Sequence, residues 1–126
     1  MSKTNTGNFF EDFQVGQTIR HATPRTVTHG DVAVYASLYG ARHAVTSSGP
    51  FAKSLGYQTA PVDDFLVFHV VFGKTVPDIS LNAVANLGYA ECVFRAPVYP
   101  GDTLAAESEV IGLKENSNGK TGVVYV

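Results

Sequence analysis

Hydrophobic positions follow two different periods along this chain. In the first half, Val32, Tyr35 and Leu38 recur at the spacing of an α-helix. After residue 88, apolar and polar residues alternate, as they do in a half-buried strand. The sequence therefore predicts helices first and a series of antiparallel strands afterwards.

The first half begins with a strand and continues with two short helices. Residues 18–28 are rich in β-branched side chains and predict an irregular strand, because a proline within them restricts it to an edge or a bulge. Thr28 and Asp31 form an S/T-x-x-D start signal for a helix that Gly40 ends. Residues 49–56 have proline near the entry and glycine at the exit, which predicts a brief second helix.

The most apolar segment, residues 60–77, is compatible with a buried strand or a buried helix, because its periodicity does not decide between them. Its length favours a helix from about Asp63 to Phe72. Asp63 and Asp64 would stand in the first turn, where carboxylates complement the helix dipole, and Gly73 would end the helix. Such a helix is apolar on all sides, so we expect it to be buried.

Strands and tight turns are predicted in the second half of the chain. The strands are at 89–96 and 103–113, and the turns are at 99–102 and 115–120. Another strand begins after these turns, and no return partner follows it before Val126. We therefore expect an α+β domain over residues 1–126, with an antiparallel sheet wrapped around one long buried helix and truncated before its last strand or strands.

Composition and charge exclude several classes of protein. The chain has 126 residues, of which 44% are hydrophobic, and this suffices for the core of one domain. A net charge of -2 with 16% charged residues provides no basic stripe for nucleic acid. No apolar run resembles a signal peptide or a membrane span, so we expect a cytoplasmic protein.

Cysteine and histidine positions give no sign of a metal site. The single cysteine, Cys92, excludes an internal disulfide and a cysteine-based metal cluster. The four histidines lack the spacing of zinc ligands, so no metal is expected. His21 and His29, at the ends of the first predicted strand, are expected at the surface. His69, on the apolar helix, is expected to be a hydrogen-bonded core residue.

Several stretches of the sequence resemble the MaoC-like acyl-CoA dehydratases, which have the hot-dog fold. The stretches "FFEDFQVGQ" and "RAPVYPGDTL" carry this resemblance. Within that family, "TNTGNFFEDF", "IRHATPRTVT" and "GLKENSNGKTGVVYV" resemble the amino-terminal part of the mesaconyl-CoA hydratases, also called β-methylmalyl-CoA dehydratases. The resemblance covers most of residues 4–126 and implies a hot-dog fold and reversible addition of water to an enoyl-CoA thioester.

The same resemblance locates the active-site loop, but its proton-transfer residues are absent. The family pattern G-D-x-N-P-x-H aligns with residues 40–46, which places its Asp on Ala41 and its His on Thr46. In the family, backbone N–H groups at the start of the central helix stabilise the developing oxyanion. Here Asp63 and Asp64 replace the family's His-Gly pair at that position, and two carboxylates beside a developing negative charge would oppose it.

Two explanations of this departure stay open. In the first, this hot-dog half is a structural and CoA-contacting partner, and a second half supplies the catalytic dyad. In the second, the chemistry has moved to the candidate catalytic residues His43, Asp63 and Asp64. Arg42 and Phe65 are then the candidate substrate-binding residues, because a guanidinium can pair with a carboxylate or a CoA phosphate. The two aspartates also fit ordinary helix-capping positions, and the loop residues also fit a solvated loop.

The sequence therefore predicts a hydratase of the mesaconyl-CoA hydratase type, acting on a short branched or dicarboxylic enoyl-CoA without metal or redox cofactor. The alternatives are a hot-dog thioesterase and a non-catalytic half that pairs with a catalytic one. Since hot-dog units pair so that the site lies between two of them, the resemblance also implies a homodimer or pairing with a second hot-dog half.

Overall fold

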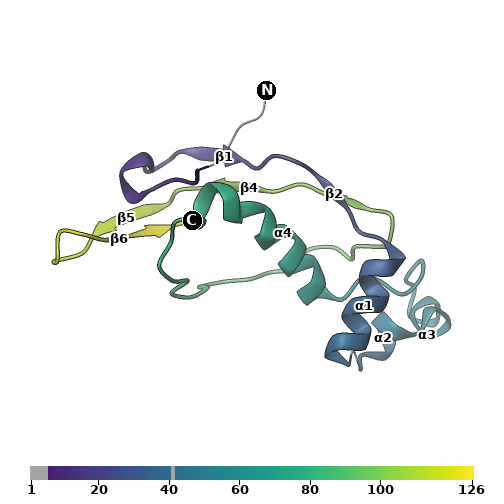
Figure 1. Ribbon diagram of the computed structural model, residues 1–126. Helices are drawn as coiled ribbons and strands as arrows, with labels where there is room; N and C mark the ends of the chain where they lie inside the picture. Colours follow the sequence, from purple (N-terminus) through teal and green to yellow (C-terminus); the bar gives the residue numbers. More distant parts are fainter. Residues whose placement is uncertain (1–5, 41) are drawn as a thin grey trace. The chain divides into compact units, whose positions relative to one another are not determined.

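The computed structural model describes residues 6–40 and 42–126 and has an α+β organisation (Figure 1). Its elements in chain order are η1 (Phe10–Asp12), β1 (Thr18–Arg20), β2 (Arg25–Thr26), α1 (His29–Tyr39), α2 (Ala44–Ser47), α3 (Gly49–Ser54), α4 (Asp64–Ile79), β3 (Thr103–Leu104), β4 (Glu107–Glu109), β5 (Gly112–Glu115) and β6 (Gly122–Tyr125).

Two compact units make up the chain, and each combines segments that are distant in sequence. The first unit contains the chain up to Thr23 together with Phe72–Gly88 and Ala105–Val126. The second unit contains Pro24–Val71 and Tyr89–Leu104. The long helix α4 belongs to both, because its first turns fall in the second unit and its last turns in the first.

Helix α1 begins and ends at the residues that the sequence indicates. The Thr28 hydroxyl accepts a hydrogen bond from the Asp31 N–H at 3.1 Å, and the Asp31 carboxylate accepts one from the Thr28 N–H at 2.8 Å. This reciprocal cap satisfies two N–H groups that lack partners inside the helix. Gly40 ends the helix in the left-handed conformation, with φ of 60°, which glycine adopts without steric cost. Both predicted signals are confirmed.

The apolar segment forms a helix rather than a strand, but α4 is longer than the spacing predicts. It continues through Gly73 and Pro77 to Ile79, so the expected end at Phe72 is wrong. A glycine inside a helix costs only about 1 kcal/mol relative to alanine, which contacts on either side can outweigh. The burial expected on all sides is found on one face only, where Leu66 and Val70 are buried.

An apolar cluster forms the core of the second unit. Leu66 and Val70 on α4 pack against Val27 and Val62, and all four side chains are buried. Strands β2 and β3 pair antiparallel beside this cluster, with Arg25 opposite Leu104. Burying side chains of this size contributes about 1.5–3 kcal/mol each, so the cluster is the main stabilising feature of this unit.

Two strand pairs organise the first unit. Strand β1 pairs antiparallel with β4, with Ile19 opposite Ser108. Strands β5 and β6 form a hairpin in which Leu113 lies opposite Val124. The hairpin closes at the predicted turn, where the Gly119 N–H donates to the carbonyl of Asn116 at 3.0 Å. The predicted strand over residues 103–113 is therefore three short strands rather than one.

A buried polar group joins the last turn of α4 to these strands. The His21 side chain is 0% exposed, and its Nδ1 lies 2.9 Å from the Asp78 carboxylate. Its Nε2 lies 2.8 Å from the hydroxyl of Ser108. The expectation that His21 is a surface residue is wrong, whereas His29 is exposed as expected. His21 is buried because both ring nitrogens have polar partners, which offsets the cost of removing them from water.

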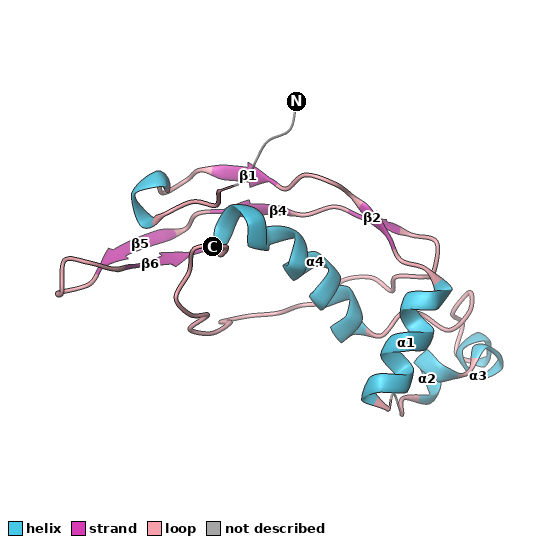
Figure 2. Ribbon diagram, in the orientation of Figure 1, coloured by secondary structure: helices cyan, strands magenta, loops and turns pink. Residues whose placement is uncertain are grey.

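The predicted strand over residues 89–96 is absent. Figure 2 shows the chain between α4 and β3 as loop, and Val93 and Phe94 are 63% and 42% exposed. Within residues 90–97 the backbone forms no hydrogen bond with any part of the chain that the structure describes. A strand needs a neighbouring backbone to satisfy its polar groups, so alternation without a partner is not enough to form one.

A close approach in the first unit depends on the absence of a side chain. Gly122 in β6 lies directly under the aromatic ring of Phe10 in η1, and a Cβ atom at residue 122 would overlap that ring. Gly122 does not have the left-handed backbone that favours glycine. Glycine is therefore needed at residue 122 because it has no side chain, and not because of its backbone conformation.

Candidate functional site

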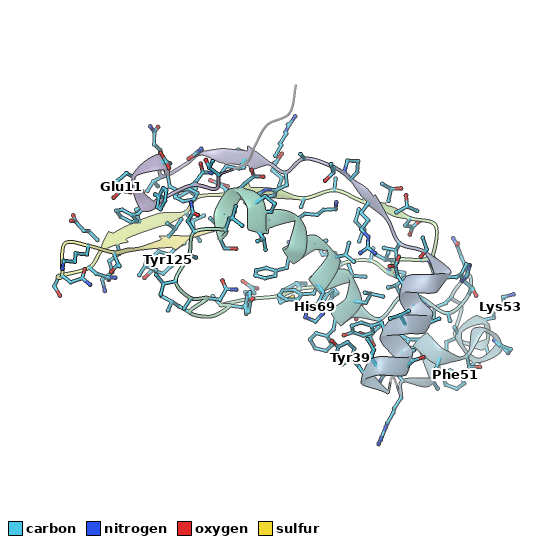
Figure 3. The ribbon with its side chains drawn as sticks, in the orientation of Figure 1. Glu11, Tyr39, Phe51, Lys53, His69 and Tyr125 are labelled. Atoms are coloured by element: carbon cyan, nitrogen blue, oxygen red, sulfur yellow. The ribbon has the colours of Figure 1, made fainter. Side chains whose placement is uncertain are left out.

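A pocket of about 390 Å³ in the second unit brings together residues from α1, the following loop and the start of α4. Its lining residues are Tyr35, Tyr39, Gly40, Arg42, His43, Asp63 and Phe65. Figure 3 shows Tyr39 on α1 and His69 on α4, which mark the two helices concerned. The pocket thus unites four of the five candidate residues that the sequence indicates, and leaves out only Asp64.

The end of α1 determines where the two basic loop residues lie. The left-handed turn at Gly40 redirects the chain, and Arg42 and His43 follow before α2 begins. The carbonyl of His43 accepts a hydrogen bond from the Thr46 hydroxyl at 3.1 Å. Thr46, at the position of the family's His, is therefore bonded to its own loop, and Ala41, at the position of the family's Asp, lies outside the described residues.

Asp63 has two roles that the sequence presents as alternatives. Its Oδ1 atom accepts a hydrogen bond from the N–H of Phe65 at 2.9 Å, so the side chain caps the start of α4. The same residue lines the pocket beside Arg42 and His43. Asp64 is exposed in the first helical turn and does not line the pocket, which fits a dipole-complementing residue.

Tyr35 lines the pocket and also contacts the apolar core. Its ring packs against the cluster that contains Val27 and Leu66. The ring centroid of Tyr39, one helical turn later, lies 4.7 Å away. Burial raises the pKa of the Tyr35 hydroxyl, and the negative charge of Asp63 raises it further. The phenol therefore keeps its proton at neutral pH.

Two site residues and one histidine differ from the expectations drawn from sequence. The sequence indicates Tyr35 only as part of a helical face and does not single out Tyr39, although their i, i+4 spacing just before the loop is the signal that could have found them. His69 is exposed and lies against the rings of Phe68 and Tyr35, at centroid distances of 5.7 and 6.3 Å. The expectation that His69 is a core residue is therefore wrong.

The pocket collects chemically complementary groups. Arg42 carries a positive charge, Asp63 carries a carboxylate, and His43 adds an imidazole ring with two nitrogen atoms that can form hydrogen bonds. The two tyrosines add hydroxyl groups and aromatic surface. Such a set can bind an anionic organic molecule and exchange protons with it. In the part of the chain that is described, no three histidine, cysteine or acidic side chains cluster as metal ligands.

Comparison with solved structures defines the class of protein. A MaoC domain protein dehydratase from Chloroflexus aurantiacus superposes with a TM-score of 0.94 at 71% identity, over 98% of this chain and 35% of that one. A double hot-dog protein from Mycobacterium tuberculosis superposes with a TM-score of 0.81 at 28% identity, over 88% of this chain and 34% of that one. The chain has the hot-dog fold of MaoC-like proteins, as the sequence predicts.

The family follows from the sequence match. The model of the mesaconyl-CoA hydratase family matches residues 1–125, and the chain belongs to that family. It is 72% identical over 125 residues to the β-methylmalyl-CoA dehydratase of Chloroflexus aurantiacus and 66% identical over 124 residues to the mesaconyl-CoA hydratase of Cereibacter sphaeroides. These matches cover 99% and 98% of this chain but 36% of each relative, so the chain spans about a third of their length.

Within residues 6–40 and 42–126, no helix is both long enough and apolar enough to cross a lipid bilayer.

Proposed function

We propose that this chain is the amino-terminal hot-dog part of a CoA-thioester hydratase, which reversibly adds water to a short branched or dicarboxylic enoyl-CoA. The observation that carries the proposal is the pocket that gathers Arg42, His43 and Asp63 where the family's active-site loop meets the central helix. Membership of the mesaconyl-CoA hydratase family supports the same reaction. A cytoplasmic location is part of the proposal, since the substrate is a CoA thioester.

Four of the pocket residues receive a role in this proposal. Arg42 binds a carboxylate of the acyl group or a phosphate of CoA, because guanidinium pairs strongly with both. His43 and Asp63 are the candidates for activating water and returning a proton to the α-carbon. Phe65, 65% exposed at the start of α4, offers an apolar surface to the thioester. Asp64 receives no role, because it does not line the pocket.

We further propose that residues 1–126 form one hot-dog domain that pairs with a second hot-dog half. The curated relatives extend well beyond the matched region, and a structural neighbour is a double hot-dog protein. The exposed Val93 and Phe94, on a stretch without backbone hydrogen bonds among the described residues, support strand pairing with another chain segment. In a homodimer, a second copy of this chain would take that place.

A second candidate function is a non-catalytic half that binds CoA while the other half supplies the dyad. The observation that favours it is the hydroxyl of Thr46, which stands at the position of the family's His and is bonded to the carbonyl of His43. A threonine hydroxyl cannot serve as a general base near neutral pH. In the first candidate function the pocket of this chain catalyses the reaction, and in the second it only binds CoA.

The two candidates are separated by an assay on mesaconyl-CoA. Three preparations are compared: this chain alone, this chain co-expressed with the remaining two thirds of the Chloroflexus relative, and that remainder alone. Hydration removes the enoyl-thioester absorbance without releasing thiol. We expect hydration in the combined preparation. If the pocket of this chain carries out the reaction, the turnover rate should fall about 100-fold in the matched variants Asp63→Asn and His43→Gln.

Other results would redirect the assignment. Undiminished turnover in both variants would assign catalysis to the other half and leave this chain as its binding partner. Release of free thiol would indicate a thioesterase. No loss of the enoyl absorbance in any preparation would contradict the proposed reaction.

A further inference from the structure

We propose that Tyr35 is a catalytic residue of this pocket, donating a hydrogen bond from its hydroxyl group to the thioester oxygen of the enoyl-CoA. This inference rests on the hydratase function proposed above. Nothing in the loop alignment indicates this residue, because it lies on α1, more than one helical turn before the loop.

The reaction needs a donor at the thioester oxygen. When water adds its oxygen to the β-carbon, one O–H bond breaks and its proton passes to a base. The electrons of the carbon–carbon double bond move toward the thioester oxygen and return when the α-carbon takes up a proton. The sum is addition of H and OH, with no oxidant or reductant. A donor held at that oxygen stabilises the enolate-like state without transferring its own proton.

One donor at the start of α4 is engaged in this chain. The N–H of Phe65, in the first turn of α4, donates to the carboxylate of Asp63 at 2.9 Å. The negative charge of that carboxylate would oppose a developing oxyanion at this helix start. The helix start is therefore a poorer oxyanion site than one without a carboxylate, and a donor from another element would add to its stabilisation.

Three observations support Tyr35 as this donor. Its hydroxyl belongs to a residue that lines the same pocket as Asp63 and His43. Its ring is held by the apolar cluster of the second unit, which limits the directions in which the hydroxyl can point. Among the described residues, no hydrogen bond occupies the Tyr35 hydroxyl, and it is therefore available to a ligand.

The protonation state of Tyr35 agrees with this role. Burial raises the pKa of its hydroxyl, and the charge of Asp63 raises it further. The O–H form, which is the form that donates, therefore persists over the neutral range. Arg42, another donor in the pocket, is exposed and carries a full charge, which suits recognition of an anionic group better than a neutral carbonyl.

The kinetic test compares Tyr35→Phe with Tyr57→Phe in the hydrating preparation. Phenylalanine keeps the ring in the core and removes only the hydroxyl. Tyr57 lies in the same unit, outside the pocket lining, and serves as the control. We expect kcat of Tyr35→Phe to fall about 100-fold with KM changed by less than about threefold, because the lost bond is strongest in the transition state. The thermal midpoint of each variant shows whether it folds.

A second measurement does not use activity. Ultraviolet titration of tyrosinate formation, compared between the parent chain and Tyr35→Phe, isolates the ionisation of Tyr35. Asp63→Asn removes a nearby negative charge and keeps a side-chain oxygen that can cap the helix. We expect this variant to lower the pKa of Tyr35, because a charge that opposes ionisation is gone.

The outcomes separate the two proposals. If the parent preparation hydrates and Tyr35→Phe matches the Tyr57→Phe control, the role of Tyr35 is overturned and the hydratase function stands. An unchanged tyrosinate titration in Asp63→Asn would also overturn the placement of Tyr35 beside that carboxylate. If no preparation hydrates the substrate, the proposed function is overturned, and the role of Tyr35 is overturned with it.

Discussion

The two ends of α4 are attached to their neighbouring strands by different kinds of contact. In the second unit, Leu66 and Val70 make apolar contacts with Val27 and Val62. In the first unit, Asp78 bonds to the buried ring of His21, which also bonds to Ser108 on β4. One helix thus has an apolar anchor near its start and a polar anchor in its last turn.

The two anchors differ in the side-chain substitutions that each one tolerates. Apolar contacts are not directional, so side chains of similar volume can replace one another at modest cost. The polar anchor needs a donor or an acceptor at each of two ring nitrogens, and losing any partner leaves a polar group inside the protein. The apolar anchor should therefore tolerate conservative exchange, whereas the polar anchor depends on the chemistry of a few positions.

The largest expected effect is at the apolar anchor. Leu66→Ala should lower the free energy of unfolding by about 3 kcal/mol, because it removes buried methyl groups and leaves a cavity beside Val27. Leu66→Met, which keeps the volume, should cost less than about 1.5 kcal/mol. Urea denaturation followed by circular dichroism measures both values. Equal losses in the two variants would show that volume is not what this anchor requires.

A somewhat smaller effect is expected at the polar anchor. His21→Ala should lower the free energy of unfolding by about 2 kcal/mol, because Asp78 and Ser108 lose this bonding partner. A double-mutant cycle of His21→Ala with Asp78→Ala should give an interaction energy on the order of 1–2 kcal/mol. His29→Ala, at an exposed histidine, serves as the control and should change stability by less than about 0.5 kcal/mol. An interaction energy near zero would contradict the polar anchor.

The smallest effect concerns Asp31 in the second unit, and it disappears in acid. Hydrogen bonds from the backbone and side chain of Thr28 hold the pKa of Asp31 below its ordinary value of 3.8, and the charge of Arg25 lowers it further. The resulting stability is fully present above 3.8 and is lost as the pH falls through the lowered pKa of the folded protein.

The neutral variant Asp31→Asn tests this assignment. It should be less stable than the parent above pH 3.8 and should approach it in stronger acid. Glu107→Gln in the first unit is the matched control, because Glu107 also pairs with an arginine but is 54% exposed. Urea midpoints measured across the acid range test this. A stability difference between parent and Asp31→Asn that does not depend on pH would exclude the titration of Asp31 as its cause.

Features carried by neighbouring residues were predictable from the sequence. The start and end of α1 depend on Thr28, Asp31 and Gly40, all within one short segment, and both predictions are confirmed. Four of the candidate residues do line one pocket, and it was the resemblance to a known family that indicated the loop and the start of α4. The end of α4 was not predictable, because Gly73 and Pro77 are stop signals that contacts in the folded chain can override.

Features that depend on distant residues were not predictable. His21 has bonding partners 57 and 87 residues away, and nothing near it in the sequence marks it as buried. Residues 89–96 have the alternation of a strand, but the backbone of residues 90–96 has no hydrogen-bonding partner among the described residues. The sequence does not indicate Tyr35 as a pocket residue, because only the folded chain brings it near Asp63.

The contact between Gly122 and Phe10 has a consequence for how such chains can diverge. Because the ring fills the space that a side chain at residue 122 would need, residue 122 cannot become larger while that ring stays in place, whereas residue 10 can become smaller first. A lineage that acquires alanine or a larger residue at 122 must first have reduced the aromatic residue at 10. The order of substitutions is therefore constrained, and the two positions should covary among descendants of this chain.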